Sequence, residues 1–381
     1  MYQVVPITEF EHLEPYREAW TRLVKEDPRA QFTQSYEWLE SYWKAFGHDK
    51  FLECHVVMFG DEPVGFAPFV LKKVSTRLGP VRLMTWPLDS WGVGYRPIGR
   101  NVTSTLFPAF RALQGSNDFD ILDLRYLPED PGLRDRCVSA CRLARVPVNA
   151  SRWQRYASFS ADCFNHWSIY VSRDLEIIEH SRQKSERLEF VRLRPDAACT
   201  EVMELWHRVV HLFDESLRSY LTGCVQGAAK LGMLDLAVAM VGDRAESVVV
   251  GHHHGSQYEV LAISPPSHAS QQASRSWLLG RIILELPWIG DEIALFRQEY
   301  VPCVANWSPS IAWTMRLTNF RTPRLKTRLL HLSRKMFGPP PPAKRRHIPH
   351  SAGGQPHTSL RLLELDSASD EPTSTRPHAS F

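Results

Sequence analysis

The chain has 381 residues, of which 43% are hydrophobic and 23% charged, so it can bury large cores in more than one domain. Its formal net charge of +3 is too small to indicate nucleic-acid binding by itself, and no apolar stretch reaches the roughly 18 residues of a membrane-spanning helix. The start of the chain shows no basic segment followed by an apolar run. Because the seven cysteines are scattered without a Cys-x-x-Cys pair, we expect reduced thiols and a cytoplasmic protein.

The first half predicts strands and helices that alternate around one hairpin. Thr8 and Glu11 have the spacing of a capping box, and Gly47 follows the last residue of a second helix. The turn at 60–63 joins two apolar strands. The expected elements are a strand at 2–5, helices from residue 8 and at 36–46, strands at 51–59, 64–73 and 81–86, a helix at 103–113, a strand at 120–126, a helix at 133–144 and a strand at 155–160.

The second half repeats this order of elements. It predicts helices at 169–190, 201–213 and 217–231, strands at 233–241, 247–254 and 258–263, a helix at 274–286 and a strand at 292–296. Each half therefore contains hairpin strands that are followed by a helix and a further strand. A tandem duplication of one α/β unit is the simplest account, and it predicts mixed, largely antiparallel sheets flanked by helices.

Three regions follow from these patterns. We expect an N-terminal domain at 1–160, a C-terminal domain at 161–337 and a tail at 338–381. The tail begins near four consecutive prolines, Pro339 to Pro342, and is rich in Pro, Ser and His. Such a segment buries too little apolar area to offset its ordering entropy, so the tail is predicted to be disordered.

Motifs of several large enzyme classes are absent from the sequence. It has no phosphate loop of the form G-x-x-x-x-G-K-[ST], no G-x-G-x-x-G after a strand and no G-x-S-x-G elbow. Kinases, P-loop enzymes, Rossmann dehydrogenases and α/β-hydrolases are therefore disfavoured.

A family resemblance begins at residues 31–39, which read QFTQSYEWL. This segment resembles the signature that opens CelD-like acyltransferases, a two-domain branch of the GNAT superfamily. The likeness continues through roughly residue 335, with the fragments PVG at 63–65, WGVGY at 91–95, LW at 205–206, VGDRA at 241–245 and WLL at 277–279. The helical spacing of Trp38, Leu39, Tyr42 and Phe46 favours a buried core stripe over substrate contact.

The resemblance implies an N-acyltransferase that moves an acyl group from acetyl-CoA or another acyl-CoA to an amine. The acceptor is expected to be a small-molecule or saccharide amine, in polysaccharide or cell-envelope metabolism. The alternative is a GNAT-like binding protein without catalysis, associated with envelope-polymer machinery.

The resemblance also places a turn that binds the pyrophosphate of coenzyme A at the start of a helix in the second half. By position it comprises Gln272, Ala273, Ser274, Arg275, Ser276 and Trp277. Ser274 is expected to cap the helix and Arg275 to pair with phosphate. The family prefers glycine in this turn, and the chain has none before Gly280. An ordinary capped helix is the alternative.

Glu299 and Tyr300 stand where the family carries an acidic residue and a Tyr-Lys pair, but Val301 replaces the lysine. Acyl transfer needs a base that accepts a proton from the amine and an acid that protonates the leaving thiolate. We expect Glu299 and Tyr300 in these roles. The missing lysine keeps the non-catalytic alternative open.

The loop from Pro87 to Pro97 is the expected acceptor site. Trp91 and Tyr95 offer flat faces for a sugar or an amide, and Asp89 offers a carboxylate for an ammonium or a hydroxyl. The competing interpretation is a tightly packed loop with Trp91 as its plug.

No metal site is predicted. His252 and His254 share one face of a strand, but no further ligand stands nearby, and Cys137 with Cys141 is more typical of a helix core. The basic run at 316–346 is favoured as a solvated face, with peripheral membrane or envelope-complex contact as the alternative and no specific nucleic acid expected.

Overall fold

The computed structural model describes residues 2–76, 79–116, 118–182, 187–194, 198–286 and 293–321. The predicted tail at 338–381 and most of the basic run lie outside them. The N-terminal half contains β1 (Tyr2–Ile7), α1 (Arg17–Glu26), α2 (Tyr36–Phe46), β2 (Lys50–Phe59), β3 (Glu62–Thr76), β4 (Gly79–Thr85), β5 (Ile98–Gly99), α3 (Val102–Gly115), β6 (Ile121–Pro128), α4 (Pro131–Leu143) and β7 (Asn149–Ser160). The C-terminal half contains α5 (Phe164–Ser181), β8 (Glu189–Leu193), α6 (Cys199–Val209), α7 (Glu215–Lys230), β9 (Leu234–Val241), β10 (Arg244–His254), β11 (Gln257–Ile263), α8 (Ala269–Glu285), β12 (Ile293–Phe296), α9 (Val301–Val304) and β13 (Ser310–Phe320).

The strands of the described residues form one sheet whose order is nearly palindromic. It runs β1-β2-β3-β4-β6-β13-β7-β12-β11-β10-β9-β8, with β5 beside β3. Reading inward from both edges matches each strand of one half with a strand of the other. Each half has one parallel pair, β4 with β6 and β11 with β12. The predicted mixed, largely antiparallel α/β architecture with flanking helices is confirmed.

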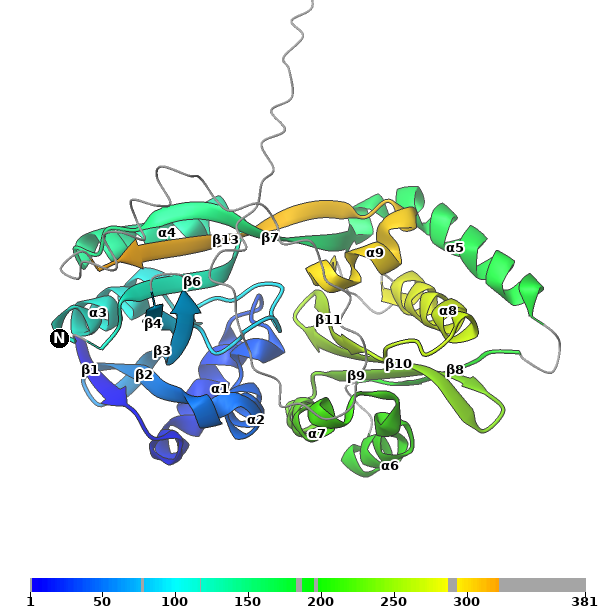
Figure 1. Cartoon of the computed structure of the whole chain (residues 1–381), viewed down its shortest axis with the longest axis horizontal. Helices are drawn as coiled ribbons and strands as arrows, with labels where there is room; N and C mark the ends of the chain where they lie inside the picture. Colours follow the sequence, from blue (N-terminus) through cyan, green and yellow to red (C-terminus); the bar gives the residue numbers. More distant parts are fainter. Residues whose placement is uncertain are drawn as a thin grey trace, which may run out of the picture.

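The two halves exchange their last strands. β7 pairs with β12 of the other half, and β13 returns to pair with β6 as well as with β7. Figure 1 shows β7 and β13 side by side, spanning both lobes of the molecule. The last strand of the predicted second domain thus completes the sheet of the first.

The main differences from the sequence predictions concern α5 with β8, the start of α8, and β13. The helix predicted at 169–190 ends at Ser181, and residues 189–193 form β8, which pairs with β9. α8 begins at Ala269, five residues before the predicted capping residue Ser274. The central strand β13 was not predicted. Its sequence, SIAWTMRLTNF, lacks a continuous apolar run because an arginine lies in the middle.

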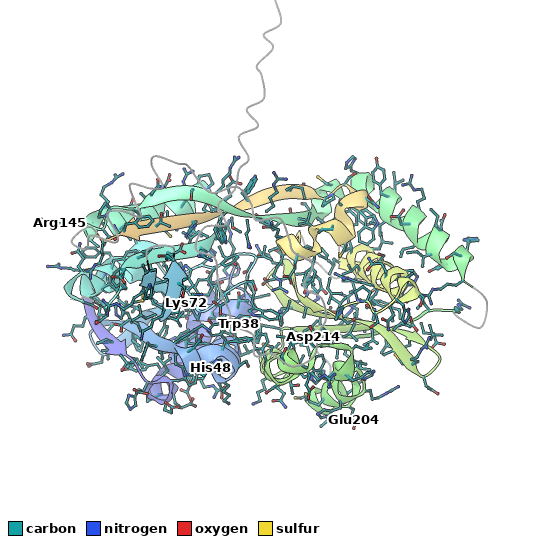
Figure 2. All side chains as sticks on the ribbon, in the orientation of Figure 1. Trp38, His48, Lys72, Arg145, Glu204 and Asp214 are labelled. Atoms are coloured by element: carbon teal, nitrogen blue, oxygen red, sulfur yellow. The ribbon has the colours of Figure 1, made fainter. Side chains whose placement is uncertain are left out.

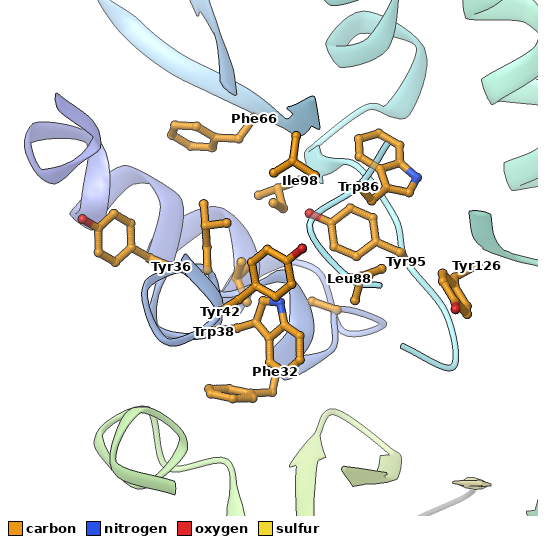
Figure 3. Close-up of a cluster of buried hydrophobic side chains, with 14 of the residues drawn as sticks. Phe32, Tyr36, Trp38, Tyr42, Phe66, Trp86, Leu88, Tyr95, Ile98 and Tyr126 are labelled. Carbon is orange, nitrogen blue, oxygen red and sulfur yellow. The ribbon is translucent and has the colours of Figure 1, made fainter. Parts of the chain in front are cut away.

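The largest hydrophobic cluster extends across both halves. It joins α1, α2, α3 and α4 to α6, α7 and one face of β9 and β10, while α5 and α8 cover the other face of the C-terminal half. Trp38, Leu39 and Tyr42 are buried in it, as the helical spacing predicted. Figure 3 shows Trp38 and Tyr42 in this cluster, with Trp86 and Tyr95 next to each other.

Helices α2 and α7 meet at the boundary between the halves, which we call the seam. A Cβ atom on Gly223 would lie 2.8 Å from Ser41 Oγ, and one on Gly227 would lie 2.7 Å from Glu37 Cβ. Only glycine at these positions lets the two helices approach so closely. At these two glycines the helices are therefore in close contact.

A buried ion cluster fixes β13 to β6. Asp123 of β6 is fully buried, and its Oδ1 and Oδ2 accept hydrogen bonds of 2.5 and 2.9 Å from Arg316 of β13. Arg125 donates to the same carboxylate at 2.8 Å. Burial raises the pKa of Asp123, but the two guanidinium charges outweigh it and hold the pKa well below its usual range. Arg316, the first arginine of the basic run, is therefore buried in the sheet and holds β13 against β6.

Among the described residues, no helix is long and apolar enough to cross a membrane.

Arg321, at the end of this part of the chain, donates to the carbonyl oxygens of Leu113 and Gln114 near the end of α3.

We predict that Asp123→Asn destabilises the protein strongly. The change leaves two buried guanidinium groups without a counter-charge, which costs on the order of 3–5 kcal/mol. Urea unfolding at neutral pH measures the loss. The matched control is Asp135→Asn, because Asp135 is exposed and paired with its neighbour Arg134; it should change stability by less than about 0.5 kcal/mol. Equal effects of the two changes would contradict this account of β13.

Candidate functional site

The parallel strands β11 and β12 pair over a short distance and then separate. Residues 257–259 face residues 293–295, after which β12 ends at Phe296 while β11 continues to Ile263. We call the unpaired edge of β11, residues 260–263, the strand gap. Two side chains that follow β12 satisfy this edge. Arg297 Nη2 donates to the Leu261 carbonyl at 2.5 Å, and the Ile263 amide donates to the Tyr300 hydroxyl at 3.2 Å.

The Tyr300 hydroxyl is arranged as a proton donor. Its oxygen accepts from the Ile263 amide and, at 2.9 Å, from Arg297 Nη2. Both bonds use the oxygen as an acceptor, so the hydroxyl proton remains available for a third group. Burial raises the pKa of Tyr300 above its usual value, although Arg297 opposes the change. The residue is therefore neutral near pH 7 and can act as an acid.

Glu259 is the titratable residue at this site that sequence reasoning missed. It lies on β11, is 3% exposed, and accepts a hydrogen bond of 3.3 Å from the Val93 amide on Oε1. Its Oε2 is buried and has no partner among the described residues. Burial raises the pKa of Glu259 to about 7, against the opposing effects of Val93 and Arg297. A lone carboxylate in the apolar segment YEVLAI was the available signal.

Glu299, the predicted base, lies differently. Its side chain is 46% exposed and forms an ion pair of 2.6 Å with Arg297 Nη2. Tyr300, its neighbour, is buried at the strand gap. The structure thus places the two predicted catalytic residues at the same arginine, and the catalytic role of each stays a prediction. The buried carboxylate of this region is Glu259, on β11.

Asp89 already holds an ammonium and a hydroxyl, both from this chain. Its carboxylate accepts from Lys72 Nζ at 2.6 Å and from the Tyr42 hydroxyl at 2.8 Å, and Lys50 Nζ lies 3.4 Å away. Its backbone has a φ of +45°, which is uncommon for a residue with a side chain. In Figure 2 the labelled Lys72 lies inside the N-terminal half. These contacts favour the packing interpretation of the loop at this residue.

The two predicted aromatic residues of the loop have different surroundings. Trp91 is half-buried, with its ring 4.9 Å from the Arg297 guanidinium and 4.7 Å from the ring of Tyr220. Tyr95 is 1% exposed and packs on Trp86 at 5.0 Å. The fold therefore brings Trp91 to Arg297, while Tyr95 belongs to the core. Their acceptor role stays a prediction.

The predicted phosphate turn lies one turn or more inside α8. Ser274 does not cap the helix: it is buried, and its Oγ donates to the Ser270 carbonyl at 3.0 Å. Trp277 is core, with Nε1 bonded to Glu179 at 2.8 Å. Arg275 is the member of the set that reaches the site, since its Nη2 donates to Cys303 Sγ at 2.9 Å and its guanidinium lies 5.8 Å from the ring of Tyr300.

The other members of the predicted turn occupy the outside of α8. Gln272 is exposed, and Ala273 and Ser276 are partly exposed. The helix instead starts at Ala269, and the side chain of its N-cap residue, His268, makes no capping hydrogen bond. The first-turn amides that favour an anion therefore lie at 269–271.

The three consecutive histidines do not converge. His253 Nε2 pairs with Asp235 at 2.7 Å, His254 Nε2 bonds the Asp27 carbonyl at 2.8 Å, and the His252 ring stacks on Phe32 at 4.4 Å. The described part of the chain contains no group of three or more His, Cys, Asp or Glu side chains placed to hold a metal.

No family model matches the sequence, and no curated protein does. Solved structures do match. FemX has a TM-score of 0.53 at 10% identity, over 87% of this chain and 99% of its own. The C-terminal domain of a putative lysylphosphatidylglycerol synthetase from Agrobacterium fabrum has a TM-score of 0.52 at 12% identity, over 84% and 96%. A tandem GNAT protein from the clavulanic acid biosynthesis pathway has a TM-score of 0.47 at 11% identity, over 85% and 100%.

The chain shares the overall fold of FemX and of that synthetase domain. At identities of 10–12% this likeness concerns the fold alone. The predicted membership of the GNAT superfamily and of its CelD-like branch stays a prediction.

We predict that Asp89 stabilises the protein in a pH-dependent way. Burial raises the pKa of Asp89, but the charges of Lys72 and Lys50 outweigh it and lower the pKa to about 2. Because the folded-state pKa lies below the unfolded value, the stabilisation is present above about pH 4 and is lost as the pH falls toward 2. Asp89→Asn should therefore cost about 2 kcal/mol at pH 7 and progressively less below pH 4. Urea unfolding across this range provides the measurement, and a difference that is constant with pH would exclude the charged network.

Proposed function

We propose that this protein transfers an acyl group from acyl-CoA to a primary amine at the strand gap. The observation that carries the proposal is that a group able to donate a proton and a group able to accept one both lie along β11. The hydroxyl of Tyr300, a neutral acid, is bonded at Ile263 of β11, and Glu259, a buried carboxyl with a pKa of about 7, lies on the same strand.

The residues divide the proton transfers between them. As the amine nitrogen attacks the thioester carbonyl, the C–N bond forms and the C–S bond breaks. Glu259, when ionised, accepts the proton that the amine loses, and Tyr300 gives its proton to the leaving sulfur. The pKa of Glu259 lies near working pH, where a general base is most effective. In this proposal Glu299 serves Arg297 rather than the amine.

The residues at the start of α8 fit the diphosphate of an acyl-CoA. The first-turn amides at 269–271 have no side-chain cap, and the positive end of the helix dipole favours an anion there. His268 and Gln272 are exposed beside this turn. Acyl-CoA supplies the activated thioester, and we place its phosphates at 268–272 rather than at the predicted 272–277.

A second candidate is a GNAT-like binding protein without catalysis. One observation favours it: Arg297 donates to the Leu261 carbonyl, and the Ile263 amide donates to Tyr300. These two backbone groups of the strand gap are therefore not open to a ligand. Acyl-CoA binding and turnover separate the two candidates.

We predict that millimolar acetyl-CoA raises the melting temperature and protects residues 268–272 from hydrogen exchange, because a ligand that binds the folded state stabilises it. With a panel of amino sugars, amino acids and polyamines, thiol release should depend on the amine. Tyr300→Phe should reduce it about 10²-fold. Tyr170→Phe, on the surface helix α5, is the matched control. Binding without amine-dependent release would favour the non-catalytic candidate, and no binding would exclude both acyl-CoA roles.

We predict that the rate rises with pH through about 7 as Glu259 ionises, and that Glu259→Gln removes this rise. Stability gives an independent check. The folded-state pKa lies above the unfolded value, so the contribution of Glu259 is present below about pH 4.5 and is lost as the pH rises through 7. Between about pH 5 and 8 the wild type should lose about 3 kcal/mol relative to Glu259→Gln. Parallel stability curves would contradict the raised pKa.

A further inference from the structure

One buried guanidinium contacts both halves of the molecule. Arg297 follows β12 and is 4% exposed. Its Nη1 donates to the Ser90 carbonyl of the N-terminal half at 3.1 Å, while its Nη2 donates to the Leu261 carbonyl of β11 at 2.5 Å. The two ends of one planar group thus bind backbone of two different halves.

On the C-terminal side, Arg297 orients the proposed acid. Its Nη2 donates to the Tyr300 hydroxyl at 2.9 Å, and the guanidinium lies 5.0 Å from the centre of the tyrosine ring. Glu299, 2.6 Å from the same nitrogen, forms an ion pair that helps to hold the guanidinium in place. The hydroxyl oxygen is thereby held as an acceptor, which fixes the direction of its proton.

On the N-terminal side, Arg297 holds the loop that contacts the proposed base. The Trp91 ring lies 4.9 Å from the guanidinium, next to the bonded Ser90. A turn with a 2.8 Å hydrogen bond from the Trp91 amide to the Leu88 carbonyl stiffens this segment. Two residues later, the Val93 amide donates to Glu259. The loop therefore covers Glu259 from the position that Arg297 sets.

We propose that Arg297 is a positioning residue that holds Tyr300 and Glu259 in one geometry by fixing the 87–97 loop of the N-terminal half against β11. The transfer site is then completed by both halves, although its reacting groups lie in one. The identity of acid and base rests on the proposed function; the positioning rests on the contacts above. A planar guanidinium can bind two acceptors that face different directions, whereas an ammonium is a point charge and cannot reach both.

Arg297→Lys keeps the charge and removes the fork, so it isolates positioning from electrostatics. The loop should loosen and admit water to Glu259. Because burial is the largest cause of the raised pKa, the midpoint of Glu259 should fall from about 7 by about one unit or more. Carbon-13 NMR of the glutamate carboxyls follows this titration, with the Glu259 signal assigned by its loss in Glu259→Gln. The exchange of the Val93 amide should also accelerate about tenfold or more.

Arg275→Lys is the matched control. Arg275 also lies over the Tyr300 ring, but it donates a hydrogen bond to Cys303 and not to the loop, so the Glu259 midpoint should stay at its wild-type value. If Arg297→Lys fails to fold, Glu299→Gln decides the question. It removes an exposed partner of Arg297 and should accelerate Val93 exchange several-fold.

An unchanged Glu259 midpoint together with unchanged Val93 exchange in the folded variants overturns the inference. A shift confined to Arg297→Lys supports it, and an equal shift in Arg275→Lys overturns it. None of these measurements needs a substrate. A protein that shows the shift without amine-dependent thiol release would lose the proposed function and keep the positioning role of Arg297.

Discussion

The pairing of β7 with β13 is the constraint on which the rest of the molecule depends. Each strand leaves its own half and supplies the missing neighbour of β12 or β6 in the other, so backbone groups that would lie at open edges are bonded. The exchange fixes where the halves meet. It brings the 87–97 loop against the end of β12, and with it Trp91 against Arg297. The contact of Arg297 with the 87–97 loop therefore depends on the sheet.

The two halves carry an arginine at matching positions, but this arginine has different partners in each half. Ile121 and Ile293 each open a parallel ladder, and an arginine stands four residues after each of them, Arg125 and Arg297. Both guanidinium groups are buried against a tryptophan. In the N-terminal half a buried carboxylate neutralises the arginine, which makes a structural cluster. In the C-terminal half the carboxylate partner, Glu299, is exposed, and the arginine also donates to two backbone carbonyls and to the Tyr300 hydroxyl.

Local sequence patterns predicted which segments form helices and strands better than they predicted which residues and strands contact one another. The hairpins, the core stripe of α2 and the strands that follow α3 and α8 were all predicted from spacing and turn residues. β13 escaped because Arg316 interrupts its apolar pattern, and that residue is compatible with a buried strand only through Asp123, far away in sequence. The predicted start of α8 was too late in the chain because serine is a common N-cap residue. In the structure Ser274 lies inside the helix, and its buried hydroxyl donates to the Ser270 carbonyl of the preceding turn.

The sequence by itself determined the class of fold, most of its helices and strands and the segment around Tyr300, because periodicity and turn chemistry act over a few neighbouring residues. Only the tertiary structure decided the state of the charged groups. The pKa of Glu259 is raised because a loop around Val93, 166 residues earlier in the sequence, covers its carboxyl group. The carboxylate of Asp89 binds Lys72 and Tyr42 of the same chain and is therefore not open to a ligand. Burial and charge compensation depend on contacts between distant segments, and no local pattern in the chain records them.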